Sequence, residues 1–141
     1  MTKEDKEILL KDLCARLPYG VKIHTSFMGH ENDEELIVIN KNAMLGDYES
    51  VVINPVEDDI NDGYELENVK PYLRPMSSIT EEEKKDIENY LAAEAIYSNS
   101  SLNEALRAQR HTTNFLYSKH LDVLGLIEKG LALEATEGMY K

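Results

Sequence analysis

The sequence predicts an α+β protein: an N-terminal helix, a small antiparallel β-sheet or SH3-like barrel, and two C-terminal helices. Apolar residues recur at helical spacing before residue 18, alternate with polar residues from 20 to 69, and return to helical spacing after residue 80. The length of 141 residues fits one domain. The expected parts of this single domain, 1–141, are an N-terminal helix 1–19, an acidic β segment 20–69, a proline-containing linker 70–79 and a helical part 80–141.

The first helix is expected over residues 2–17. Thr2 can cap its N-terminus, with Asp5 in the reciprocal position of a capping box. Pro18 disfavours helical geometry at the residue before it, and Gly20 permits a turn, so the helix ends there. Cys14 lies within the apolar stripe of this helix, which predicts a small buried side chain rather than a reactive thiol.

The β segment is expected to contain four or five short strands separated by tight turns. Residues 21–27 alternate between apolar and polar types, which is typical of a half-buried strand. A polar turn over 29–33 is expected to lead into an apolar strand over 36–39. Further strands are predicted over 43–45, 50–53 and 64–69, with an Asp-Gly turn at 62–63.

Two helices are expected after the linker. Thr80 and Glu83 have the spacing of a full capping box, and the helix is predicted to run to about Tyr97. Ser101 is placed to cap a further helix that runs to about His120. No internal repeat accompanies these elements.

Most of the excess negative charge lies in the β segment. The chain has a net charge of −12, and residues 31–67 contain twelve acids and one base. This charge disfavours binding to nucleic acid and to anionic membranes, because both contacts depend on Lys and Arg. It serves either solubility or recognition of a basic partner. The candidate interaction residues are Asp58, Asp59, Asp62, Glu65 and Glu67.

Several classes of protein are disfavoured by missing motifs. The chain has no long apolar run and no apolar stretch behind its first residues, so neither a transmembrane helix nor a secretory signal is expected. A single cysteine excludes an internal disulfide. The acidic run 58–63 fails the calcium-loop template, and the four histidines lack metal-ligand spacing. No catalytic, cofactor-binding or metal-binding residue is predicted, so an enzyme is unsupported.

Two smaller groups of residues carry alternative interpretations. In the linker, the apolar Tyr72, Leu73 and Met76 are expected to close the open end of the sheet against the helices. Alternatively, Lys70 and Arg74 beside Tyr72 form a small pocket for an anion or a partner carboxylate. Arg107, Arg110 and Asn114 share one face of the last helix, which follows another helix as in a helix-turn-helix reader. The acidic balance of the chain favours the simpler interpretation of this face, which is ordinary solvent exposure.

Three stretches resemble a family of uncharacterised small proteins from gut anaerobic bacteria and their phages or mobile elements. These stretches are LCARLPYGV at 13–21, VKPYLRPMSS at 69–78 and GLIEKGLA at 125–132. The acidic β segment has no counterpart, and Val123-Leu124 stands where the family usually has Tyr-Arg. That departure argues against a binding role for these two positions. The resemblance implies a cytoplasmic setting and a mobile-element background. It does not indicate any particular activity.

The leading functional hypothesis is a non-catalytic interaction module whose acidic β surface contacts a basic protein partner, with nucleic-acid mimicry as a special case. The alternative is a DNA-binding accessory protein that uses the helix over 101–120. An enzyme ranks third and requires a deep pocket with convergent polar groups.

Overall fold

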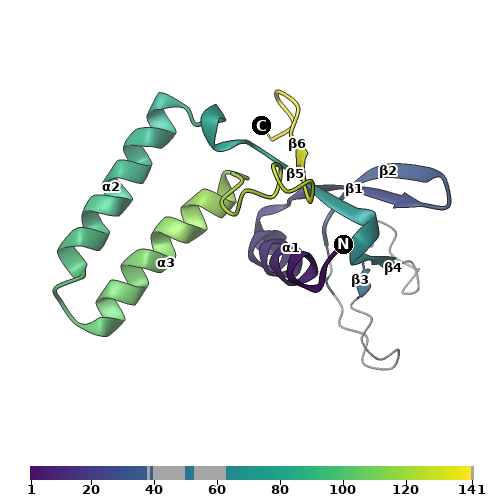
Figure 1. The fold of residues 1–141 in the computed structure, drawn as a ribbon. Helices are drawn as coiled ribbons and strands as arrows, with labels where there is room; N and C mark the ends of the chain where they lie inside the picture. The colour runs from purple at the N-terminus through teal and green to yellow at the C-terminus, as the bar shows by residue number, and fades with distance from the viewer. Residues whose placement is uncertain (38, 40–49, 53–62, 141) are drawn as a thin grey trace.

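The computed structural model describes residues 1–37, 39, 50–52 and 63–140, and Figure 1 shows their arrangement. One part of the molecule is a body in which the first helix packs on a small sheet. The other is a hairpin of two long helices that projects away from this body. The α+β class is therefore confirmed, with an N-terminal helix and two C-terminal helices.

Helix α1 spans Lys3–Arg16 and begins as predicted. The Thr2 hydroxyl accepts a hydrogen bond from the Asp5 amide, and the Asp5 carboxylate accepts one from the Thr2 amide. A 3₁₀ turn with Pro18 follows, and Gly20 takes a left-handed conformation with φ 68°. The prediction of a buried Cys14 was wrong, because the side chain is exposed. Leu13 occupies the buried face of the helix. Cys14, one residue later, is turned by about 100° around the helix axis and so leaves that face.

The main sheet has four strands in the order β2-β1-β5-β6. These are β1 Lys22–Phe27, β2 His30–Glu35, β5 Val69–Leu73 and β6 Leu133–Glu134. Strands β2 and β5 are antiparallel to β1, whereas β6 is parallel to β5. A separate two-stranded ladder joins β3 Ser50–Val52 to β4 Gly63–Glu65. The described strands thus form a mixed open sheet and a short ladder, and the SH3-like barrel is not confirmed.

The turn between the first two strands is shorter than predicted. Met28 and Gly29 both have positive φ, at 49° and 80°, and the two residues connect Phe27 to its partner His30. The polar residues over 30–35, predicted partly as a turn, are strand β2, because an edge strand needs no continuous apolar face. Leu36, predicted to begin a strand, is buried just past the end of β2. The strand predicted over 43–45 lies outside the described residues.

Most of the first half of the predicted linker is strand β5. Val69, Pro71 and Leu73 are buried and alternate with the half-buried Lys70 and Tyr72. Pro71 lies opposite Ile23 of β1 in the ladder. The sequence pattern was ambiguous here because a proline inside a run of residues argues against a strand.

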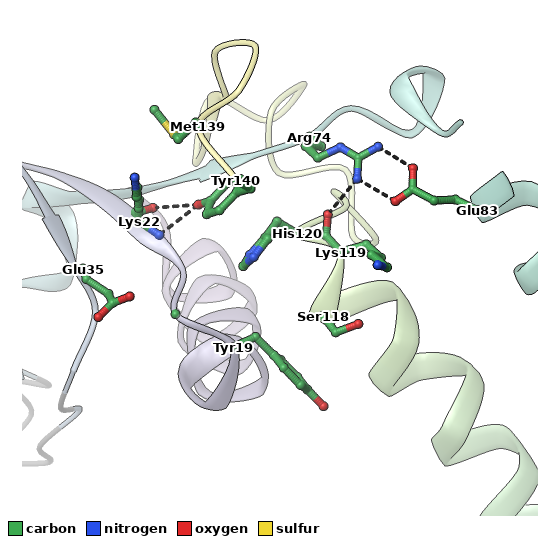
Figure 2. Close-up of a pocket in the computed structure, with 11 residues that line it drawn as sticks. Tyr19, Lys22, Glu35, Arg74, Glu83, Ser118, Lys119, His120, Met139 and Tyr140 are labelled. Carbon is green, nitrogen blue, oxygen red and sulfur yellow. Dashed lines mark hydrogen bonds and ion pairs between the residues drawn. The ribbon is translucent and has the colours of Figure 1, made fainter. Parts of the chain in front are cut away.

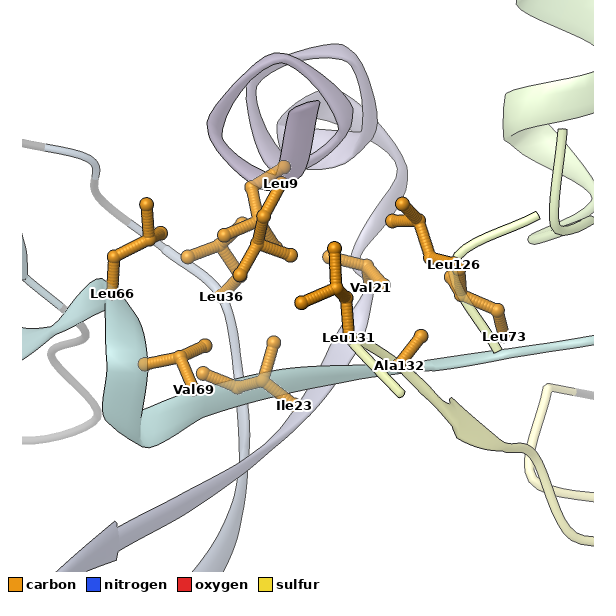
Figure 3. Packing of buried hydrophobic residues seen from close by; sticks show 11 residues of the cluster. Leu9, Val21, Ile23, Leu36, Leu66, Val69, Leu73, Leu126, Leu131 and Ala132 are labelled. Atoms are coloured by element: carbon orange, nitrogen blue, oxygen red, sulfur yellow. The ribbon is translucent and has the colours of Figure 1, made fainter. Parts of the chain in front are cut away.

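The hydrophobic core lies between α1 and the sheet (Figure 3). Leu9 of α1 points toward the sheet residues of this cluster (Figure 3), and Leu13 belongs to the same cluster. The turn after α3 supplies the far side of the core through Leu126 and Leu131. Residues more than 100 positions apart in the chain therefore complete a single apolar cluster.

The projecting hairpin consists of α2, Glu81–Tyr97, and α3, Leu102–Ser118. Both hydrogen bonds of the Thr80–Glu83 capping box are present, as predicted. The Ser101 hydroxyl caps α3 by accepting from the Glu104 amide. Among the residues described, no helix combines the length and the apolar character that crossing a membrane requires.

We expect Leu9→Ala to lower the free energy of unfolding by about 2–5 kcal/mol, because it leaves a cavity beneath α1. The matched substitution Leu124→Ala, at a side chain 41% exposed, should change it by less than about 0.5 kcal/mol. Urea denaturation followed by circular dichroism measures both values. Equal effects of the two substitutions would contradict the placement of the core.

Candidate functional site

The principal cluster of polar side chains lies where α3 ends and the chain returns to the sheet. His120 adopts a left-handed conformation with φ 59°, which turns the chain out of the helix. The Arg74 amide donates to the His120 carbonyl, and the Asp122 amide donates to the Arg74 carbonyl, both at 2.8 Å. These two bonds form a parallel β-bridge between Arg74 and Leu121. The chain directly after α3 therefore lies beside the residue that follows β5.

A fully buried ion pair lies on the α1 side of this junction. The Arg16 guanidinium donates to both carboxylate oxygens of Asp12, at 2.7 and 3.0 Å, and neither side chain is exposed. Arg16 also donates to the Leu121 carbonyl at 2.6 Å and lies 4.8 Å from the centre of the Tyr117 ring. Burial raises the pKa of Asp12, and the hydrogen bonds from Arg16 oppose this rise. Arg16 thus joins α1 to the end of α3.

A second ion pair connects the sheet to the start of α2. Arg74 donates to both carboxylate oxygens of Glu83, at 2.8 and 2.7 Å. The same two terminal nitrogens also donate to the carbonyls of Lys119 and Ser78. Hydrogen bonding from Arg74 is the largest cause that lowers the pKa of Glu83 to about 2. One guanidinium therefore holds the end of β5, the start of α2 and the end of α3 together.

A stacked pair of rings forms the third contact. The rings of His120 and Tyr140 lie 3.6 Å apart, centre to centre, at an angle of 12°. The Tyr140 hydroxyl accepts from the Lys22 amide at 2.8 Å and donates to the Tyr72 carbonyl at 2.7 Å. Burial, with a smaller contribution from neighbouring cations, lowers the pKa of His120 to about 4. The imidazole is therefore neutral at pH 7.

The Arg74–Glu83 ion pair and the His120–Tyr140 rings border a cleft of about 500 Å³, shown in Figure 2. Glu83 and His120 both line it, but their pKa values of about 2 and about 4 are poorly matched to general acid–base catalysis near pH 7. Within the described part of the chain, no group of three His, Cys, Asp or Glu side chains is placed to hold a metal ion. The lining residues are Tyr19, Gly20, Lys22, Glu35, Arg74, Glu83, Ser118, Lys119, His120, Met139 and Tyr140.

Of the predicted pocket residues, only Arg74 lines this cleft. Lys70 and Tyr72 lie at alternate positions of β5, and the Tyr72 hydroxyl donates to Asp33 on β2 at 2.8 Å. The carboxylate that Arg74 contacts is Glu83 of the same chain. Lys70 and Tyr72 are therefore not lining residues of this cleft, and the prediction of a pocket formed by all three residues stays a prediction.

The other predicted site residues are spread over the molecule. Asp58, Asp59 and Asp62 lie outside the described residues. Glu65 belongs to β4, and Glu67 forms an ion pair with Lys6 of α1 at 2.7 Å. The predicted nucleic-acid face is exposed on α3, at Arg107, Arg110 and Asn114.

Sequence reasoning missed Asp12, Arg16, His120 and Tyr140 as members of the junction. A signal was present for the ion pair, because residues 9, 12, 13 and 16 follow helical spacing along one stripe. Two opposite charges four residues apart within a stripe of buried leucines indicate a buried pair. No local pattern identified His120 or Tyr140, since their contacts depend on segments distant in the chain.

Comparison of the chain with protein-family models, with curated proteins and with solved structures finds no match.

We expect Asp12→Ala to lower the free energy of unfolding by about 3–5 kcal/mol, because it leaves the Arg16 charge buried without a counter-ion. The double variant Asp12→Leu with Arg16→Met should recover much of this loss, since no charge is then buried. Urea denaturation of both variants measures the difference. If the double variant were less stable than Asp12→Ala, an unpaired buried charge on Arg16 would not be the cause of the loss.

Stability should also fall as the pH is lowered from about 6.5 toward 4. The folded protein holds His120 neutral, with its pKa lowered from 6.5 to about 4, so the unfolded chain binds a proton first. The contribution of this linkage to the free energy of unfolding is fully present above pH 6.5. It falls by roughly 2–3 kcal/mol as the pH approaches 4. His120→Asn, which tolerates the left-handed backbone, should flatten the slope of stability against pH in this window. The exposed control His111→Asn should retain the wild-type slope.

Proposed function

We propose that the protein is a non-catalytic interaction module whose acidic sheet edge contacts a basic protein partner. The observation that supports this most directly is the composition and position of strand β2. A special case of the proposal is that the acidic surface mimics nucleic acid toward a nucleic-acid enzyme. A cytoplasmic setting and a phage or mobile-element background belong to the proposal through the family resemblance alone.

Strand β2 lies at the edge of the four-stranded sheet and, among the described strands, pairs with β1 alone. Four of its six residues are acidic, and the carboxylates of Glu31, Asp33 and Glu35 belong to exposed residues. Hydrogen bonds from His24 and Tyr72 lower the pKa of Asp33, so this carboxylate stays ionised at neutral pH. An acidic edge repels another copy of itself and favours a partner that carries Lys and Arg.

The alternative function, reading of DNA by α3, has weaker support from the arrangement of charges. Arg107 and Arg110 are exposed, but α2 packs along the same helix and carries six acids against two lysines. DNA phosphates approaching α3 would therefore meet the negative field of α2.

Affinity capture from host lysate tests the proposed function. We expect the protein to retain a basic partner at ~50 mM salt and to lose most of it at ~300 mM, because the contact is electrostatic. Nuclease treatment should leave the partner bound. Glu31→Gln with Glu35→Gln, added to Asp58→Asn, Asp59→Asn and Asp62→Asn, should reduce the recovered partner at least tenfold.

A control variant removes charge elsewhere on the surface. Glu4→Gln with Glu128→Gln neutralises two exposed carboxylates away from β2 and should leave recovery unchanged. If both sets of variants lost the same amount of recovered partner, the binding would depend on net charge alone. The proposal of a specific acidic surface at β2 would then be wrong. Recovery of nucleic acid that disappears on nuclease treatment would instead direct mutagenesis to Arg107 and Arg110.

A further inference from the structure

The free edge of strand β2 has a definite hydrogen-bonding pattern. In an antiparallel ladder, residues whose amide and carbonyl groups point toward the neighbouring strand alternate with residues whose groups point away from it. Just past the end of β2, the Leu36 amide donates to the Val21 carbonyl at 2.9 Å. In the next pair of the ladder, Lys22 and Glu35, the backbone groups therefore point away from each other.

The contacts of Lys22 support the same assignment independently (Figure 2). Its amide donates to the Tyr140 hydroxyl at 2.8 Å, and that hydroxyl also donates to a carbonyl of β5. The Lys22 amide is thus directed toward β5, and the backbone of Glu35 is directed away from β1. Because the pattern repeats every second residue, the amide and carbonyl groups of Glu31, Asp33 and Glu35 point to the free edge.

The same three residues carry carboxylates on one face of the sheet. Side chains two residues apart in a strand lie on the same face. Asp33 contacts His24 of β1 and the hydroxyl of Tyr72, which alternates with the buried residues of β5, so this face is opposite the core. The side chains of Glu31 and Asp33 are 71% and 61% exposed. The outward backbone groups of this edge are therefore flanked by accessible carboxylates.

An extended partner segment can use both features at once. A strand added at this edge pairs its backbone with these three residues, and its directly opposite residues lie on the same face as the carboxylates. Opposite charges directly across two strands stabilise the pairing, whereas like charges destabilise it. A basic helix cannot do the same, because its own amides and carbonyls are bonded within the helix. The edge therefore selects an extended segment with a basic residue at every second position.

We propose that β2 accepts an extended segment of the basic partner as a further antiparallel strand of the sheet. Lys or Arg at alternate positions of that segment lies opposite Glu31, Asp33 and Glu35. Backbone hydrogen bonds supply the affinity of such an added strand, and its alternating side chains supply the specificity. Antiparallel addition is favoured because it places both hydrogen bonds of a pair on the residue that carries the carboxylate. This mode of binding rests on the proposed function and specifies the conformation and the charge pattern of the partner.

Binding of synthetic peptides to the purified full chain tests strand addition. The probe is a fluorescent heptapeptide that alternates Lys and Thr, and its control has the same composition with all lysines in one block. Fluorescence anisotropy should show the alternating peptide binding at least about fivefold more tightly at ~50 mM salt, because it alone places every cation on the acidic face.

The backbone contribution is measured with N-methylated peptides, which lose amide donors without losing charge. In an antiparallel addition, the Lys amides of the alternating peptide point toward β2 and the Thr amides point away. Methylation of the Lys amides should therefore weaken binding at least about tenfold, whereas methylation of the Thr amides should change it by less than about twofold.

A matched pair of variants tests the same hydrogen bonds from the side of the protein. Glu31→Pro removes an amide at the free edge and no hydrogen bond of the β1–β2 ladder. Glu31→Gln removes the same charge and keeps the amide. We expect Glu31→Pro to bind the alternating peptide at least about threefold more weakly than Glu31→Gln does. Circular dichroism verifies that both variants keep the fold.

Hydrogen exchange of the wild type, followed by NMR, gives a readout without any substitution. The amides of Glu31 and Asp33 should exchange at least about tenfold more slowly when the alternating peptide is bound. The amides of Asn32 and Glu34 should keep their rates, because they are already bonded to β1.

Equal binding of the alternating and block peptides, with no difference between the two N-methylated forms, would overturn strand addition and leave the acidic contact of the proposed function standing. Loss of binding on methylation of the Thr amides instead would overturn the antiparallel orientation, because parallel pairing uses the amides on either side of each opposite residue. If neither peptide bound below ~1 mM, strand addition would be wrong, and capture from lysate would decide on the proposed function separately.

Discussion

The buried Arg16 guanidinium imposes the strictest requirement on this structure. A cation without solvent contact requires an adjacent counter-ion and hydrogen-bond acceptors, and among the described residues Arg16 finds acceptors for Nε and Nη2 but none for Nη1. Asp12 supplies the counter-ion from one turn earlier in α1, but the Leu121 carbonyl and the Tyr117 ring come from the far side of the chain. Because of this, α1 cannot be buried without α3 in place. The apolar turn at Leu126 and Leu131 then completes the core that α1 begins.

The junction and the hairpin tip have opposite physical characters. At the base, Arg74 and Glu83 fix both helices to the sheet through charge-assisted hydrogen bonds that have a definite geometry. At the tip, leucines are exposed and have no such constraint from the body. The β1–β2 hairpin and the α2–α3 hairpin extend from opposite sides of the body (Figure 1). The acidic edge at β2 and the exposed leucines of the α2–α3 hairpin therefore lie on opposite sides of the body.

Elements governed by local rules could be predicted from the sequence. The capping residues Thr2, Thr80 and Ser101 located three helices, and alternation located β1. Strand β2 was misplaced because an exposed acidic edge strand has the composition of a turn. Strand β5 was read largely as a linker because of Pro71. The junction depends on pairs such as His120 with Tyr140 and Lys22 with Tyr140, whose partners have no fixed spacing in the sequence. Only the Asp12–Arg16 spacing offered a local signal.

The long-range bond from Arg16 to Leu121 also determines when the molecule becomes stable during its synthesis. The two residues are 105 positions apart. At translation rates of roughly 5–20 residues per second, α1 waits about 5–20 s on the ribosome before its partner carbonyl is made. The α2–α3 hairpin, whose contacts are local, forms earlier, so its leucines are presented while the body is still incomplete.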